Sequence, residues 1–281
     1  MKDIDPFRDD VFHHIEKVIG LPSKGVPDLK HLNLLLPSLK GKHILEIGCR
    51  RGWFARWCFN EGAAHIDCLT GPTMLSEASK EGCMAVTVTF EAISNLCHFG
   101  LSLSIERLDQ NAGSGYDLIS CFLTLHYSGD LRRIVELAEF YLVTGGHFVF
   151  SVEHPMRTAP KQPQLLERDD IHDTRKDKHY WPMSDYADEG KRHVEWLGYR
   201  ITRYHYTLQT YFRVLRDAGF KITDFKEWGY GTDQVRHRAG VLSSYSEEVG
   251  PAFALFVAKK EERKGKPIRW RIPLSDVLDD E

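Results

Sequence analysis

Short apolar runs alternate with helical patterns between residues 43 and 152. Five of these runs have the length and the β-branched or aromatic content of strands, and the near-continuous run YDLISCFL is typical of a central parallel strand. We expect these strands at residues 43–48, 65–69, 85–90, 116–123 and 147–152. The alternation predicts a parallel sheet with helices on both faces.

Helical patterns fill the intervals between the expected strands. Gly71-Pro72 precedes one helix because proline suits the first helical turn, and Gly145-Gly146 is expected to end another. Further along the chain, Gly219 follows a last helical pattern, and two more strand-like runs come after it. The fold class predicted is α/β, with a doubly wound, mostly parallel sheet of about seven strands. The expected helices cover residues 53–61, 72–82, 131–142 and 207–218, and the last two strands cover 221–228 and 252–259.

The pattern breaks after residue 154, where the chain becomes polar and rich in Asp, Lys and His, with several prolines. Long irregular segments in compact domains are usually functional or disordered. We therefore expect one domain, residues 1–154 and 200–260, with residues 155–199 inserted as a lid over the site. Residues 261–281 carry many charges of both signs, which predicts a solvated C-terminal tail.

Charge and cysteine content narrow the classes of function. The formal net charge is -3 and the basic residues are scattered, so the electrostatic footprint of a nucleic-acid-binding protein is missing and a small-molecule partner is expected. The six cysteines form no C-x-x-C pair and fall on apolar segments, which predicts buried thiols and no metal site. The chain begins without an apolar signal region and contains no membrane-length apolar run, so we expect a cytoplasmic protein without a membrane partner. The oligomeric state is left open.

Four short segments lie where an open α/β sheet binds nucleotide-like ligands, at the carboxyl ends of its strands. They are EIGCRRG at residues 46–52, YDLI at 116–119, LHY at 125–127 and SVEHP at 151–155. Their succession resembles class I S-adenosylmethionine-dependent methyltransferases, in particular a small-molecule branch, and the likeness covers roughly residues 30–259. The resemblance implies a Rossmann-like methyltransferase fold in which the last strand is antiparallel.

Two departures from that family concern the cofactor. The family's loop reads E/D-x-G-x-G-x-G, whereas its middle glycine is Arg50 here, and the family's ribose-binding acid corresponds to Leu69. Asp67 lies about 6.6 Å earlier on the strand and could substitute only if the register shifted. Losing one charged hydrogen bond costs roughly 1.5–3 kcal/mol, so S-adenosylmethionine would bind weakly, which points to a repurposed scaffold. The positions that correspond to the family's cofactor contacts are Glu46, Gly48, Arg50, Gly52 and Leu69.

Candidate catalytic residues lie after the fourth and fifth strands, where the family's substrate sits. Histidine titrates near neutrality and can move a proton or hydrogen-bond a developing enolate or phenolate. The same histidines could instead fix the lid, satisfy a buried carbonyl or cap a helix. The candidates are His126, Glu153, His154 and His205.

Aromatic residues around the lid and the returning helix suit the walls of an apolar pocket, although part of this set could be ordinary core. Three lid arginines, Arg157, Arg192 and Arg203, could meet an anionic substrate group or could simply be solvated. The candidate substrate-binding residues are Tyr127, Trp181, Tyr186, Trp196 and Tyr211.

Together these features favour a small-molecule enzyme of natural-product biosynthesis that keeps the methyltransferase fold but works independently of S-adenosylmethionine. Cyclisation, pericyclic rearrangement, dehydration or isomerisation would suit such a pocket, which holds a reactive conformer and stabilises developing charge. The first alternative is S-adenosylmethionine-dependent methyl transfer to an O, N or C nucleophile, with His126 or His154 as the base. The second alternative is a non-catalytic binding protein.

Overall fold

The protein is described here by a computed structural model. The described residues are 29–48, 53–70, 84–87, 115–162, 166–167, 179–180, 183–196, 199–229 and 250–262. The helix expected at residues 72–82 and nearly all of the charged tail lie outside these ranges.

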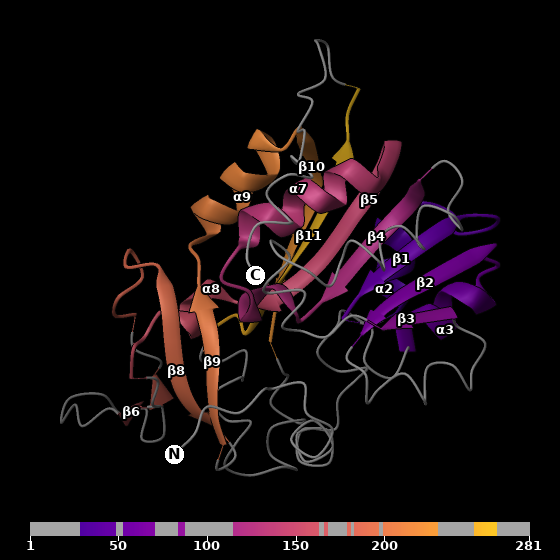
Figure 1. Ribbon diagram of the computed structural model, residues 1–281. Helices are drawn as coiled ribbons and strands as arrows, with labels where there is room; N and C mark the ends of the chain where they lie inside the picture. The colour runs from indigo at the N-terminus through magenta and orange to yellow at the C-terminus, as the bar shows by residue number, and fades with distance from the viewer. Residues whose placement is uncertain are drawn as a thin grey trace, which may run out of the picture.

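A seven-stranded sheet with the order β10-β11-β5-β4-β1-β2-β3 forms the centre of the molecule (Figure 1). The strands β1 to β5 are parallel to one another, and β11 is antiparallel to both of its neighbours, β5 and β10. The expected doubly wound α/β class and the antiparallel last strand are therefore confirmed. The strand bounds are β1 His43–Ile47, β2 His65–Thr70, β3 Met84–Thr87, β4 Tyr116–Phe122, β5 Leu142–Glu153, β10 Phe220–Trp228 and β11 Phe253–Lys260.

The two faces of the sheet carry separate hydrophobic clusters, because successive strand side chains point to opposite faces. Phe148, Phe150 and Phe256 pack on one face with residues of two helices, α7 and α9. Val149 and Val257 pack on the other face with residues of α2 and α3. The helix bounds are α2 Leu29–Leu35, α3 Trp53–Asn60, α7 Leu131–Tyr141, α8 Pro155–Thr158 and α9 Leu208–Asp217, with a short 3-10 helix, η2, at Leu125–Tyr127.

Helix α7 illustrates how the sequence pattern produces the packing. Its buried residues are Leu131, Ile134, Val135 and Ala138, at the i, i+3, i+4 and i+7 spacing of one helix face. The carboxylate of Asp130 accepts from the backbone N–H of Arg133 and so caps the first turn. The helix therefore begins where the sequence predicts and turns its apolar face to the sheet.

The glycine pair Gly145-Gly146 does not end helix α7 as expected. The helix ends at Tyr141, and β5 begins with the next residue. The glycines lie inside β5, where its pairing with β4 is irregular and jumps from Tyr116↔Leu142 to Leu118↔His147. A Cβ on Gly146 would lie 2.9 Å from the carbonyl oxygen of Val143, so the close backbone approach in this irregularity is what requires glycine.

The segment expected to form a lid, called the lid below, contains regular structure that the polar sequence did not predict. Strands β8 (Gly190–Trp196) and β9 (Tyr199–His205) form an antiparallel hairpin, and a smaller pair joins β6 (Leu166–Glu167) to β7 (His179–Tyr180). Figure 1 shows β8 and β9 beside α8, near the carboxyl end of β5. The hairpin spans residue 199, where the sequence predicts the end of the insertion.

Three of the six cysteines lie in the described ranges: Cys58, Cys68 and Cys121. All three are buried free thiols, as the sequence predicts. Within the same ranges, no helix has both the length and the apolar character needed to cross a membrane.

Candidate functional site

Gly48, after the carboxyl end of β1, lies against Thr124, after the carboxyl end of β4. Gly48 follows β1 with a φ of +74°, and a Cβ placed on it would lie 2.4 Å from Oγ1 of Thr124. Thr124 follows β4, and its hydroxyl donates to the carbonyl of Phe122 at 2.9 Å. Only glycine satisfies both the left-handed backbone and the close approach. The loop after β1 therefore starts in direct contact with the segment after β4.

The residue before Thr124 has a strained backbone. Leu123 has a φ of +47°, a left-handed conformation that costs a non-glycine residue roughly 1–2 kcal/mol. Its N–H donates to the carbonyl of Ser151 on β5 at 2.8 Å, which holds the turn in place. Such outliers cluster at functional sites. The strain at Leu123 is consistent with a candidate site at the carboxyl end of β4.

Glu46 on β1 contacts the first turn of α3. Its carboxylate is buried and accepts from the N–H of Ala55 at 3.1 Å, in the first turn of α3. This contact links β1 to the helix that follows the glycine-rich loop, and a carboxylate near a helix N-terminus is electrostatically favourable. Arg50 and Gly52, the other two loop residues expected to meet a cofactor, lie outside the described residues.

The end of β2 decides whether another acid replaces Leu69. The register pairs Leu69 with Ile47, the last residue of β1, and pairs Asp67 with Leu45. Asp67 is fully buried, and its Oδ2 accepts from the hydroxyl of Tyr116 at 2.6 Å and lies 3.1 Å from Nε2 of His65. Asp67 therefore lies two residues before Leu69 on β2, and its Oδ2 is engaged with Tyr116 and His65.

These features fit S-adenosylmethionine only in part. Gly48 provides the backbone turn that a cofactor could approach closely, and Glu46 binds the N–H of Ala55 at the start of α3. The residue that corresponds to the family's ribose-binding acid is Leu69, which pairs with Ile47 at the end of β1, and Asp67 lies two residues earlier with its Oδ2 bound to the Tyr116 hydroxyl. No group of three or more His, Cys, Asp or Glu residues in the described part of the chain could hold a metal ion.

The sequence also matches the family described as methyltransferase domain over residues 25–224, which is more than half of the chain. The protein belongs to the class I S-adenosylmethionine-dependent methyltransferase family. An uncharacterised protein of Haemophilus influenzae is 30% identical over 194 residues, covering 69% of this chain and 72% of that protein.

Solved structures of the methyltransferase family agree with this assignment. An S-adenosylmethionine-dependent methyltransferase from Mesorhizobium loti superposes with a TM-score of 0.66 at 27% identity, covering 85% of this chain and all of that one. A candidate S-adenosylmethionine-dependent methyltransferase from Listeria monocytogenes gives a TM-score of 0.62 at 25% identity, covering 83% of this chain and 97% of the other. The Rossmann-like methyltransferase fold is thus established.

His126 and Glu153 meet at the carboxyl ends of β4 and β5. The His126 ring is buried in η2, and its Nδ1 accepts from the backbone N–H of Glu153 at 3.3 Å. The same ring lies against Tyr127, with 4.3 Å between the ring centroids. The structure therefore brings together three of the residues that the sequence predicts for the site.

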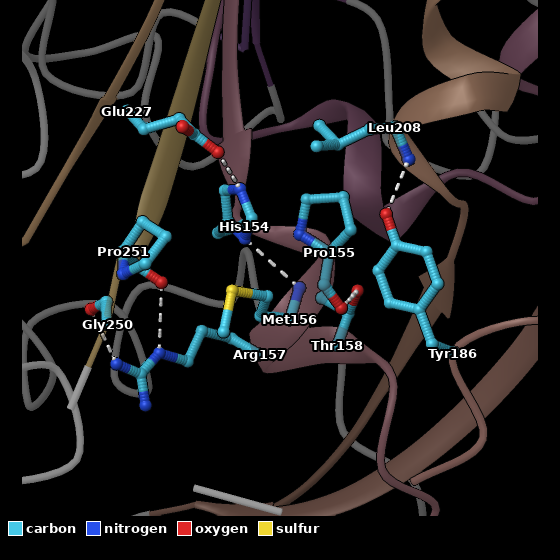
Figure 2. Close-up of polar contacts among 10 residues, drawn as sticks. All are labelled: His154, Pro155, Met156, Arg157, Thr158, Tyr186, Leu208, Glu227, Gly250 and Pro251. Atoms are coloured by element: carbon cyan, nitrogen blue, oxygen red, sulfur yellow. Dashed lines mark hydrogen bonds and ion pairs between the residues drawn. The ribbon is translucent and has the colours of Figure 1, made fainter. Parts of the chain in front are cut away.

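His154 braces the base of the lid. It is the N-cap of α8, and its Nδ1 accepts from the N–H of Met156 at 3.1 Å (Figure 2). Its Nε2 donates to Oε1 of Glu227 at 2.7 Å. Burial lowers the pKa of His154, and the hydrogen bond to Glu227 opposes that shift. Both ring nitrogens thus serve the structural role that the sequence left as the alternative.

His205 joins the lid to α8. Its Nε2 donates to the carbonyl of Tyr186 at 2.8 Å, and its Nδ1 accepts from the hydroxyl of Thr158 at 2.8 Å. Burial lowers the pKa of His205, while the hydrogen bond to Tyr186 opposes the shift. The phenol oxygen of Tyr186 in turn accepts from the N–H of Leu208 (Figure 2). Thr207, not His205, caps the helix that follows.

The remaining aromatic candidates separate by location. Tyr211 is buried in the core between α9 and the sheet, where its ring lies 5.5 Å from that of Phe256, and burial raises its pKa well above 10. That position makes it part of the packing beneath the site. Trp196 ends β8 opposite Tyr199, with its side chain outside the described part, and Trp181 lies wholly outside it.

The three lid arginines are buried rather than solvated. Arg157 donates to the carbonyls of Gly250 and Pro251 at 2.9 and 3.2 Å, as Figure 2 shows. Arg192 donates to the carbonyl of Ala159 at 3.0 Å. Buried guanidinium groups need such partners, because an unpaired buried charge is costly. Arg157 therefore joins α8 to the segment before β11, whereas Arg192 joins residues within 155–199.

Sequence reasoning missed Thr124, Thr158 and Glu227, which contact Gly48, His205 and His154 respectively. Thr158 and Glu227 are 47 and 73 residues away from their partners, so no local pattern could connect them. Thr124 alone had a local signal, because it directly precedes the LHY segment.

Proposed function

We propose that this methyltransferase-family protein is a small-molecule enzyme that works without S-adenosylmethionine, as a catalyst of the cyclase, pericyclase or isomerase type. The placement of Leu69 and Asp67 at the end of β2 supports this proposal. Leu69 stands level with the last residue of β1, and the nearby acid, Asp67, is engaged with Tyr116 and His65.

Loss of the ribose-binding carboxylate would weaken the binding of S-adenosylmethionine. A carboxylate that takes a ribose hydroxyl contributes a charged hydrogen bond of roughly 1.5–3 kcal/mol, which corresponds to about one to two powers of ten in the dissociation constant. Arg50 adds a bulky charged side chain where the family has glycine. Both changes lie at positions that serve the cofactor, while the core that forms the fold is intact.

The carboxyl ends of β4 and β5 supply groups suited to such a reaction. Because Nδ1 of His126 accepts from Glu153, the neutral imidazole carries its proton on Nε2. An N–H in that position would stabilise negative charge developing on an enolate or phenolate oxygen of the substrate. Tyr127 beside it and the aromatic residues of the lid would hold an apolar natural-product substrate in a reactive conformation.

Methyl transfer is the second candidate. It is favoured by Gly48, whose left-handed turn against Thr124 preserves the start of the cofactor loop, and by the likeness to the Mesorhizobium loti methyltransferase. In that case His126 would serve as the base towards the methyl acceptor.

Calorimetric titration of the full-length chain with S-adenosylmethionine, and separately with S-adenosylhomocysteine, distinguishes the two. The proposal expects no saturable binding of either compound at micromolar concentrations. Micromolar affinity for both would overturn it in favour of methyl transfer. An unrelated adenine nucleotide, titrated in parallel, controls for nonspecific binding.

A further inference from the structure

Arg203 connects the lid to the end of β5. It lies on the lid strand β9, and its Nη1 donates to Oε2 of Glu153 at 2.6 Å. Its Nη2 donates to the carbonyl of Arg157 at 2.9 Å, in the short helix that follows β5. Both charged side chains of the pair are buried. One guanidinium thus bridges the lid hairpin, the last residue of β5 and α8.

Glu153 makes a second contact through its backbone. Its N–H donates to Nδ1 of His126, so this one residue touches Arg203 with its carboxylate and the imidazole with its amide. Which nitrogen of a neutral imidazole carries the proton depends on the hydrogen bond that the other nitrogen makes. The N–H of Glu153 therefore favours the tautomer of His126 that carries its proton on Nε2.

We propose that Arg203 is a positioning residue, which fixes Glu153 and thereby holds His126 with its proton on Nε2. When β9 packs against the end of β5, the same contact orients the imidazole of His126. This inference rests on the proposed function only in taking His126 as the group that meets the substrate.

Loss of the Arg203 guanidinium should have a measurable effect on His126. A buried carboxylate without its cationic partner is strongly disfavoured. Glu153 would then either turn towards water and displace the end of β5, or favour the protonated form of a neighbouring group, whose positive charge would replace that of Arg203. Either response disturbs the hydrogen bond that keeps Nδ1 of His126 unprotonated.

The hairpin offers a matched control. Arg192 lies directly opposite Arg203 in the β8–β9 pairing and is buried to a similar extent. Its guanidinium donates to backbone carbonyls, including that of Ala159, and holds the same lid. Arg192→Ala therefore removes an equivalent lid contact and leaves the Arg203–Glu153 pair in place.

The test is ¹⁵N NMR of the imidazole nitrogens of His126 in the full-length protein, assigned by comparison with His126→Gln. The wild type is expected to show an unprotonated Nδ1 and a protonated Nε2, and Arg192→Ala should keep this pattern. In Arg203→Ala the two nitrogen signals should move towards each other, as the tautomers mix or the ring becomes cationic. Equal spectra in the two alanine variants, or an unchanged spectrum in Arg203→Ala, would overturn the proposal.

A second pair of variants keeps the test decisive should Arg203→Ala fail to fold. Arg203→Lys retains the charge and is expected to preserve the wild-type pattern, whereas Arg203→Gln retains length and loses the charge and is expected to lose it. Identical spectra for these two variants would contradict the role of Arg203. Because neither cofactor nor substrate is present, tight S-adenosylmethionine binding would remove the proposed function and leave this result standing.

Discussion

His154 at the end of β5 donates from Nε2 to Oε1 of Glu227 on β10, at 2.7 Å. Its other ring nitrogen, Nδ1, accepts from the N–H of Met156 and caps α8. One neutral imidazole therefore fastens the start of the lid to the antiparallel side of the sheet. A residue placed by sequence among the catalytic candidates has both nitrogens engaged in holding the fold together.

This arrangement predicts a stability cost for His154→Ala. Loss of the cap and of the buried ring should lower the free energy of unfolding by about 1–3 kcal/mol. His154→Asn can still cap the helix and should cost less. Glu227 is partly exposed, so Glu227→Gln should change stability little. Urea denaturation of the three variants checks the order, and equal losses for the alanine and asparagine variants would contradict the capping role.

The buried imidazole of His205 should make the free energy of unfolding depend on pH. Burial lowers its pKa in the folded protein below the usual 6.5, and nearby Arg192 lowers it further. As the pH falls through about 6.5, the unfolded chain binds a proton that the folded chain does not, so stability declines until the folded-state pKa is reached. The slope for one such group is at most about 1.4 kcal/mol per pH unit.

The measurement compares urea denaturation at about pH 7.5 and about pH 5.5, a window in which ordinary carboxyl groups stay ionised. His205→Gln keeps a donor for the Tyr186 carbonyl and an acceptor for the Thr158 hydroxyl but cannot titrate. The wild type should lose more stability across the window than this variant. The same loss in both proteins would show that His205 does not titrate as its burial predicts.

A side chain at position 48 should destabilise the start of the loop after β1. Gly48→Ala forces a left-handed alanine, at about 1–2 kcal/mol, and overlaps Thr124 for roughly a further 1–3 kcal/mol. Gly41 has almost the same φ, +73°, and a Cβ placed on it would meet no atom within 4 Å, so Gly41→Ala isolates the backbone cost. Adding Thr124→Ala should recover part of the difference. Equal destabilisation at Gly41 and Gly48 would refute the contact.

The central strands could be predicted from the sequence because they are apolar on both faces. Tyr116–Phe122 and Phe253–Lys260 lie between two hydrophobic clusters, and a run that must be buried on both sides remains visible in a single sequence. The glycine pair at residues 145–146 misled because glycine ends helices and also permits irregular strands. Only the partner strand shows which of the two applies.

The lid hairpin was invisible for the opposite reason. Its inward positions include Arg192, Arg203 and His205, so β8 and β9 show no apolar alternation. Carbonyls, a carboxylate and a hydroxyl pair with these polar groups, several of them from distant segments, and the sequence does not reveal which ones. The same limit applied to Asp67, whose partner Tyr116 is 49 residues away. Candidate site residues could be placed at strand ends, but their hydrogen-bond partners could not.

We propose that Leu69 at the end of β2 and the engagement of Asp67 with Tyr116 leave this methyltransferase-family protein without the ribose contact of its family. Calorimetric titration of S-adenosylmethionine into the wild type and into the double variant Arg50→Gly, Leu69→Asp measures the effect, and Arg50→Gly, Leu69→Asn serves as the uncharged control. The aspartate variant is expected to bind at least about tenfold more tightly than the wild type, or about 1.4 kcal/mol, with a smaller gain for the asparagine control. A wild type that binds S-adenosylmethionine as tightly as the aspartate variant would show that the ribose contact is not missing.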